Sequence, residues 1–170
     1  MSYNIIFSYK KIGENNKKIQ RFFDTKQVIN IETKPVESNA YIGIIEIPKI
    51  NLKKGFVNPY SVHNNISKNI TIIKPFMMPD EKNSTFVLAA HSGNSHVSYF
   101  KDIYKLDIDD VVYIYFNNKK YKYKIVKHYE EEKDGTITIK DNSNNKKLVL
   151  TTCKSFNKQL IYIAHLNRVI

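Results

Sequence analysis

The chain has 170 residues, of which 42% are hydrophobic and 25% are charged, a composition typical of a globular protein with one main domain. The net charge of +11 suits contact with polyanions, but the lysines are scattered along the chain, so charge alone defines no partner. A single cysteine excludes an internal disulfide, and no apolar run approaches the roughly 18–20 residues that cross a bilayer.

The N-terminal part of the chain differs in pattern from the rest. Residues 10–24 repeat apolar side chains at helical spacing among charged ones, which predicts an amphipathic helix. Residues 25–39 are polar and contain a proline, as linkers do. We therefore expect an N-terminal helical appendage and linker over residues 1–39, and a main domain over residues 40–170.

The main domain consists of short apolar runs separated by turn residues. A hairpin is the clearest feature, because residues 111–116 and 121–125 both have strand patterns and flank an Asn-Asn-Lys-Lys turn. Further strands are expected at 41–47, 50–52, 70–73, 136–139 and 160–164, a turn at 53–55, a loop at 56–69 and a short helix at 96–104. With the two runs described next, about eight strands predict a mainly β fold, a small closed or nearly closed barrel.

Two of the apolar runs end on chemically reactive side chains. Residues 85–93 read Thr-Phe-Val-Leu-Ala-Ala-His-Ser-Gly, and residues 147–153 read Lys-Leu-Val-Leu-Thr-Thr-Cys. A lone cysteine is more often an inert core residue, but a nearby imidazole can supply the charge that a thiolate needs and can later protonate a leaving amine. His91 and Cys153 are therefore the candidate pair for acyl transfer, with Cys153 as nucleophile and His91 as general acid and base.

An acidic stretch invites a second interpretation. Glu130, Glu131 and Glu132 are followed by Lys-Asp-Gly, and acidic loops can bind cations. No ligand spacing is discernible, so a solvated turn is the favoured interpretation. We expect neither a metal nor another cofactor.

The order of these motifs resembles the sortase family, the cysteine transpeptidases of Gram-positive bacteria. The resemblance covers about residues 40–166 and rests on Ala-Ala-His-Ser-Gly, on Tyr-Phe-Lys-Asp with Leu-Asp-Ile-Asp-Asp-Val-Val-Tyr-Ile-Tyr, and on Leu-Val-Leu-Thr-Thr-Cys. It implies a sortase-like eight-stranded β-barrel with a few short helices and an N-terminal helix. The class B and class D branches of the family both fit.

The resemblance also implies a reaction. Cys153 would cleave a Leu-Pro-x-Thr-Gly-like sorting signal of a surface protein through a thioester, and an amine from a peptidoglycan precursor or a pilin would resolve it. Thr152, Ser92 and Lys158 are further candidates for contacting the substrate, and residues 55–69 and 128–147 for forming its groove. Such enzymes act at the extracellular face of the cell membrane, held by an anchor that this sequence does not contain.

One position departs from the family pattern. Sortases carry an arginine on the strand after the cysteine, and here Gln159 occupies the matching position. Glutamine can donate an N–H to an oxyanion but brings no charge, so turnover could be slow. The alternative is a catalytically impaired sortase-fold module that binds cell-wall or other polyanionic partners; a nucleic acid is the less favoured partner and is not expected.

Overall fold

The computed structural model describes residues 2–25, 28–31 and 33–170, with side chains from residue 10 onward. Its elements in chain order are α1 (Ser2–Asp24), β1 (Tyr41–Ile47), β2 (Leu52–Val57), β3 (Thr71–Ile72), β4 (Thr85–Ala89), β5 (Val111–Phe116), β6 (Lys119–Glu132), β7 (Lys147–Cys153) and β8 (Lys158–Val169). Short 3-10 helices lie at Pro48–Ile50 and Ile103–Lys105.

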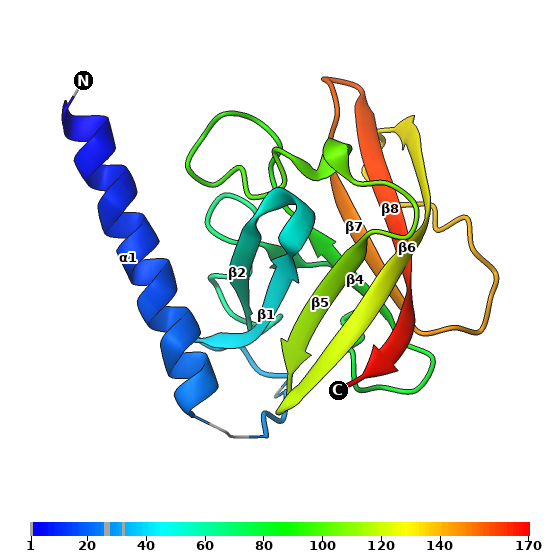
Figure 1. Cartoon of the computed structure of the whole chain (residues 1–170), viewed down its shortest axis with the longest axis horizontal. Coiled ribbons are helices and arrows are strands. Elements are labelled where there is room, and N and C mark those ends of the chain that lie inside the picture. Colours follow the sequence, from blue (N-terminus) through cyan, green and yellow to red (C-terminus); the bar gives the residue numbers. More distant parts are fainter. Residues whose placement is uncertain (1, 26–27, 32) are drawn as a thin grey trace.

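The strands form one sheet in the order β2-β1-β5-β6-β8-β7-β4-β3. Neighbouring strands are antiparallel except β4 and β7, which run parallel. An isolated bridge between Phe56 and Ile70 joins the two edges of the sheet, so the barrel is nearly closed (Figure 1). The predicted mainly β, eight-stranded barrel with an N-terminal helix is confirmed.

The neighbouring strands β4, β7 and β8 are apolar on both faces. Phe86, Leu88, Leu148 and Leu150 point into the barrel core. The residues between them form a second cluster on the outer face, made of Val87, Val149, Ile161 and Ile163. Side chains alternate between the faces of a strand, so burial on both sides explains why these runs contain no polar alternation.

A β-bulge in β6 decides which of its side chains face outward. Ile125 pairs with Ala164, and Lys127 pairs with the next residue of β8, Ile163, so Val126 is an extra residue. Before the bulge the odd-numbered residues of β6 face the core, and after it they face outward. The bulge therefore places Glu131 on the outer face of the barrel.

Helix α1 lies along the side of the barrel beside β1 and β2 (Figure 1). Ile19 and Phe22 pack on Tyr41 and Val57, which belong to a separate cluster beneath the helix. The Asn15 amide donates to the Lys53 carbonyl. The predicted helix at 10–24 is confirmed and begins earlier, whereas the division of the chain at residue 39 stays a prediction. No helix of the described residues is long and apolar enough to span a membrane.

Four local predictions were wrong. Residues 50–52 are not a strand, because Ile50 ends a 3-10 helix, Asn51 has a left-handed backbone and only Leu52 belongs to β2. Residues 96–104 form turns and end in a 3-10 helix, because the segment folds back and the Phe100 N–H bonds to the His91 carbonyl. Residues 136–139 have no neighbouring strand, and their alternation reflects Ile137 and Ile139 packing on the outer cluster. Residues 53–55 lie within β2, where Gly55 leaves room for the Tyr41 ring.

Candidate active site

The parallel pair β4 and β7 brings the two reactive residues together. Its last paired residues are Ala89 and Thr151, two residues before His91 and Cys153, so the register directs both reactive residues to the same end of the parallel pair. Side chains alternate between the two faces along a strand, and Val87 and Val149 face outward. His91 and Cys153 follow them at even spacings of four residues, which assigns both to the outer face of the barrel. Both side chains are half-buried, as a reactive but accessible pair requires.

Two hydroxyl groups hold the ends of these strands together. The Thr152 hydroxyl donates to the Ala90 carbonyl at 2.6 Å, and the Ser92 hydroxyl donates to the carbonyl of Cys153. Thr152 is 6% exposed, so its bond is shielded from water. The Ala90 N–H donates to the Thr151 carbonyl at the end of the parallel ladder. Just beyond that point, the two hydroxyl bonds fix the backbone before His91 and at Cys153.

That Thr152 and Ser92 contact the substrate stays a prediction. In this structure their hydroxyl protons are given to backbone carbonyls within the chain. Only their oxygen lone pairs remain free to accept a bond. The geometry gives both residues a role in positioning the reactive pair.

Gln159 lies next to Cys153, because a short hairpin places the two residues opposite each other in the β7–β8 ladder. On its other side Gln159 pairs with Glu131 of β6. Paired residues of neighbouring strands share a face, so Glu131, Gln159 and Cys153 form one row across the outer face. Gln159 is therefore a neighbour of Cys153, whereas its role at the family's arginine position stays a prediction.

The amide nitrogen of Gln159 is already engaged. It donates to the Glu131 carboxylate at 2.9 Å and to the Thr136 carbonyl at 2.5 Å, with a longer contact of 3.5 Å to the carbonyl of Glu132. All three partners are acceptors, which assigns the NH₂ group to that side of the amide. Its donor hydrogens therefore face β6 and away from Cys153.

The cations near the site do not replace an arginine. Lys158 precedes Gln159 on β8 and is exposed, and its side chain leaves the opposite face of the strand. Lys154 pairs with Glu130. The two arginines of the sequence lie elsewhere: Arg21 in α1, and Arg168 nine residues along β8, about 30 Å from Gln159 at the usual strand rise.

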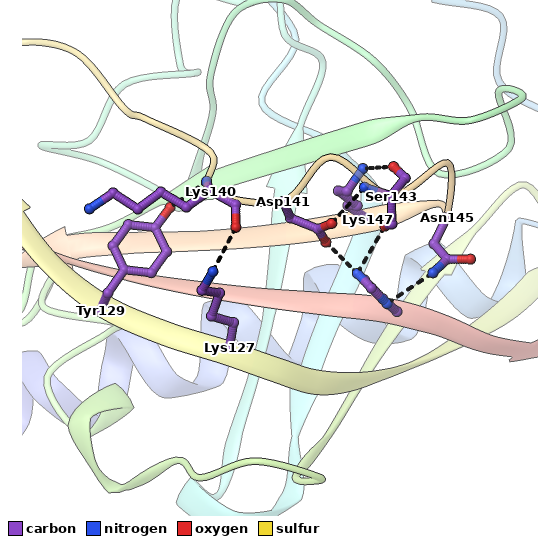
Figure 2. A network of polar contacts seen from close by, with 8 residues as sticks. Lys127, Tyr129, Lys140, Asp141, Ser143, Asn145 and Lys147 are labelled. Atoms are coloured by element: carbon purple, nitrogen blue, oxygen red, sulfur yellow. Dashed lines mark hydrogen bonds and ion pairs between the residues drawn. The ribbon is translucent and has the colours of Figure 1, made fainter.

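The connection between β6 and β7, residues 133–146, covers the outer face and is called here the β6–β7 segment (Figure 1). Figure 2 shows its polar attachments. The Lys127 ammonium donates to the Lys140 carbonyl at 2.9 Å, and the Tyr129 hydroxyl accepts a bond from the Lys140 N–H. Tyr129 also contacts the Thr138 carbonyl. The segment is thus held against β6; that residues 128–147 form part of a substrate groove stays a prediction.

The far end of the segment is fastened to β8. His165 Nε2 contacts the Asp141 carboxylate and lies 3.3 Å from the Ser143 hydroxyl, while Nδ1 lies 3.1 Å from the Asn145 amide. Serine, histidine and aspartate could suggest a hydrolytic triad. A triad needs its serine and aspartate on different ring nitrogens, and here both contact Nε2. This cluster is an anchor of the segment.

Tyr129, Glu131 and Asp141 fall within the expected groove region 128–147 but were given no role of their own, and His165 was not expected near the site. The run of three glutamates was the available signal for Glu131, but the face it occupies depends on the bulge. The other expected groove region, 55–69, lies beside β3, where the Asn64 amide bonds to the backbone of Ile72 in both directions. Among the described residues no group of three or more His, Cys, Asp or Glu side chains could hold a metal ion.

Comparison with known proteins agrees with this architecture. The family model described as the sortase domain matches residues 45–170. Sortase D of Bacillus subtilis (strain 168) is 29% identical over 133 residues, covering 78% of this chain and 64% of the relative. This chain therefore spans slightly less than two thirds of that relative's length.

Solved structures show the same fold. A Clostridium perfringens Sortase D5 transpeptidase has a TM-score of 0.61 and 21% identity, with 90% of this chain and 88% of that chain covered. Sortase C-3 of Streptococcus pneumoniae has a TM-score of 0.66 and 15% identity, with 99% and 86% covered. The fold and the match over most of the chain define a sortase-type barrel, and the chain belongs to the sortase family.

Proposed function

We propose that the protein is a cysteine transpeptidase that cleaves a Leu-Pro-x-Thr-Gly-like sorting signal through a thioester on Cys153 and transfers the acyl group to an amine. The observation that supports this proposal is the register of the parallel pair β4 and β7, whose last paired residues, Ala89 and Thr151, lie two residues before His91 and Cys153. The relatives named Sortase D favour class D of the two branches considered.

In the first half of the reaction, the Cys153 thiolate attacks the scissile carbonyl carbon and forms a tetrahedral oxyanion. The carbon–nitrogen bond then breaks, and the leaving nitrogen takes its proton from His91. A thioester remains on Cys153. The hydroxyl bonds of Thr152 and Ser92 keep the two reacting groups aligned, which matters because small misplacements of reacting atoms cost large factors in rate.

In the second half, the neutral His91 removes a proton from the incoming amine as it attacks the thioester carbonyl. The carbon–sulfur bond breaks and Cys153 leaves as thiolate, so the enzyme is regenerated. The acceptor would be an amine of a peptidoglycan precursor or of a pilin, at the outer face of the cell membrane. Water competes with the amine at this step, and the β6–β7 segment beside the site supports its exclusion.

Gln159 favours a second candidate function. Its donor hydrogens are engaged, and among the described residues no guanidinium lies near Cys153. Loss of one oxyanion donor typically slows an acyl transfer by about 10²–10³. The second candidate is therefore a catalytically impaired sortase-fold module that binds a wall polyanion through its positive charge.

Product analysis separates the two functions. The protein is incubated with a pool of Leu-Pro-x-Thr-Gly-like peptides, with and without added amines, and the products are followed by liquid chromatography and mass spectrometry. A transferred product that requires both the amine and Cys153 supports the transpeptidase. If the wild type gives no more cleaved or transferred product than Cys153→Ala across the pool, the proposal fails and the binding module is favoured.

A further inference from the structure

We propose that Glu131 and Gln159 form a carboxylate–amide lock that fastens the β6–β7 segment beside Cys153, and that Gln159 is a positioning residue which does not donate to the oxyanion. The part that concerns catalysis rests on the proposed function. The fastening itself does not, because it follows from contacts within the chain.

The lock joins three parts of the molecule. Gln159 on β8 gives its amide hydrogens to the Glu131 carboxylate on β6 and to the Thr136 carbonyl in the segment. The same Glu131 oxygen accepts the backbone N–H of Thr138 at 3.0 Å. Between these two threonines lies Ile137, which packs on the outer cluster. The bonds therefore hold the segment on both sides of its apolar contact.

The charges and acceptors explain why the amide keeps this orientation. Hydrogen bonds to an ionised carboxylate are stronger than those between neutral groups, so the NH₂ group prefers Glu131 to a neutral partner. The amide oxygen of Gln159 accepts no hydrogen bond within the described part of the chain. An oxyanion that formed near this end of the side chain would meet an acceptor oxygen, which repels it. Gln159 thus acts through the segment it holds.

A swap of the two residues separates this role from oxyanion donation. Gln159→Glu sets two carboxylates against each other and removes the donor from position 159. In the double variant E131Q/Q159E the new amide at 131 can donate to the new carboxylate at 159, which rebuilds the pair with its donor reversed. Glu132→Gln is the matched control for the substitution at 131. It removes the same negative charge from the neighbouring residue of β6, whose side chain points to the other face.

Two readouts are needed, and the first requires no substrate. We expect hydrogen exchange of residues 133–146 to be at least tenfold faster in Q159E than in the wild type and in E132Q. In the swap it should slow again in part, because the bond between 131 and 159 is restored and residue 131 can still accept the Thr138 N–H, whereas the bond to the Thr136 carbonyl is not restored. The second readout is the rate of acyl-adduct formation on Cys153. We expect it to fall at least tenfold in Q159E and to recover part of that loss in the swap, although position 159 then has no donor.

Unchanged exchange in Q159E would overturn the lock. A swap variant that regains protection of the segment but acylates as slowly as Q159E would overturn the positioning role and assign Gln159 to the oxyanion. If the wild type forms no adduct with any peptide, the proposed function fails, while the exchange data still decide whether the lock exists.

Discussion

The hydroxyl of Thr152 gives the sharpest test of how the reactive pair is aligned. Thr152→Val keeps the shape of the side chain but leaves the Ala90 carbonyl, in a residue that is fully buried, without its donor. An unsatisfied buried acceptor costs about 1–3 kcal/mol. Thr152→Ser keeps the hydroxyl and loses one buried methyl, a change of about 1 kcal/mol. The two variants should therefore lose comparable stability, but only the first loses the bond next to His91.

Urea unfolding measures the stability, and the rate of acyl-adduct formation on Cys153 measures alignment. We expect both variants to unfold at lower urea with an unchanged slope. We expect T152V to acylate about tenfold to a hundredfold more slowly than T152S, because the strand ends carrying the reacting groups shift relative to each other. Equal acylation rates of T152V and T152S would refute the idea that this hydroxyl aligns the pair.

Three further predictions concern the barrel and the β6–β7 segment. Burial, with nearby lysine ammonium groups, lowers the pKa of Lys54 to about 8. Between that pH and the ordinary lysine pKa, the unfolded chain therefore binds more protons than the folded chain. Unfolding in urea should show stability rising by at most about 1.4 kcal/mol per pH unit between pH 8 and 9.5, and Lys54→Met should abolish the rise. Gly43→Ala should cost about 1–3 kcal/mol in thermal unfolding, because its Cβ would lie 2.1 Å from a phenylalanine ring atom, whereas Gly13→Ala in open helix surface should be neutral or stabilising. Burial acts to raise the pKa of Asp141, but hydrogen bonds from a histidine and a serine outweigh it and lower the pKa to about 2. The anchoring by this carboxylate should hold above about pH 4 and fade as the pH falls toward 2, and Asp141→Asn should speed hydrogen exchange of residues 133–146 at neutral pH. Exchange in D141N equal to that of the wild type would contradict the anchor.

The sequence carried enough information for the barrel. The apolar runs before His91 and Cys153 are buried strands that run parallel and end at one edge of the sheet, whereas the catalytic roles of the two residues stay predictions. Local patterns failed where tertiary contacts decide the backbone. Residues 136–139 alternate like a strand because two isoleucines pack on the outer cluster, and no partner strand is present there.

The role of Gln159 could not be read from the sequence for a physical reason. Its position opposite Cys153 follows from the short hairpin, but the direction of its amide depends on Glu131. Glu131 faces outward only because one extra residue, Val126, reverses the alternation of β6. A single bulge residue leaves no clear mark in the hydrophobic pattern, so the donor at this position was expected to be free.

The proposed reaction requires Cys153 as the nucleophile and His91 as its acid and base. Intact-protein mass spectrometry during incubation with the peptide pool tests both roles. We expect an acyl adduct on the wild type, none on Cys153→Ala, and adduct formation slowed by at least a hundredfold on His91→Ala. An adduct that persists in Cys153→Ala, or that forms on His91→Ala at the wild-type rate, would contradict the assignment.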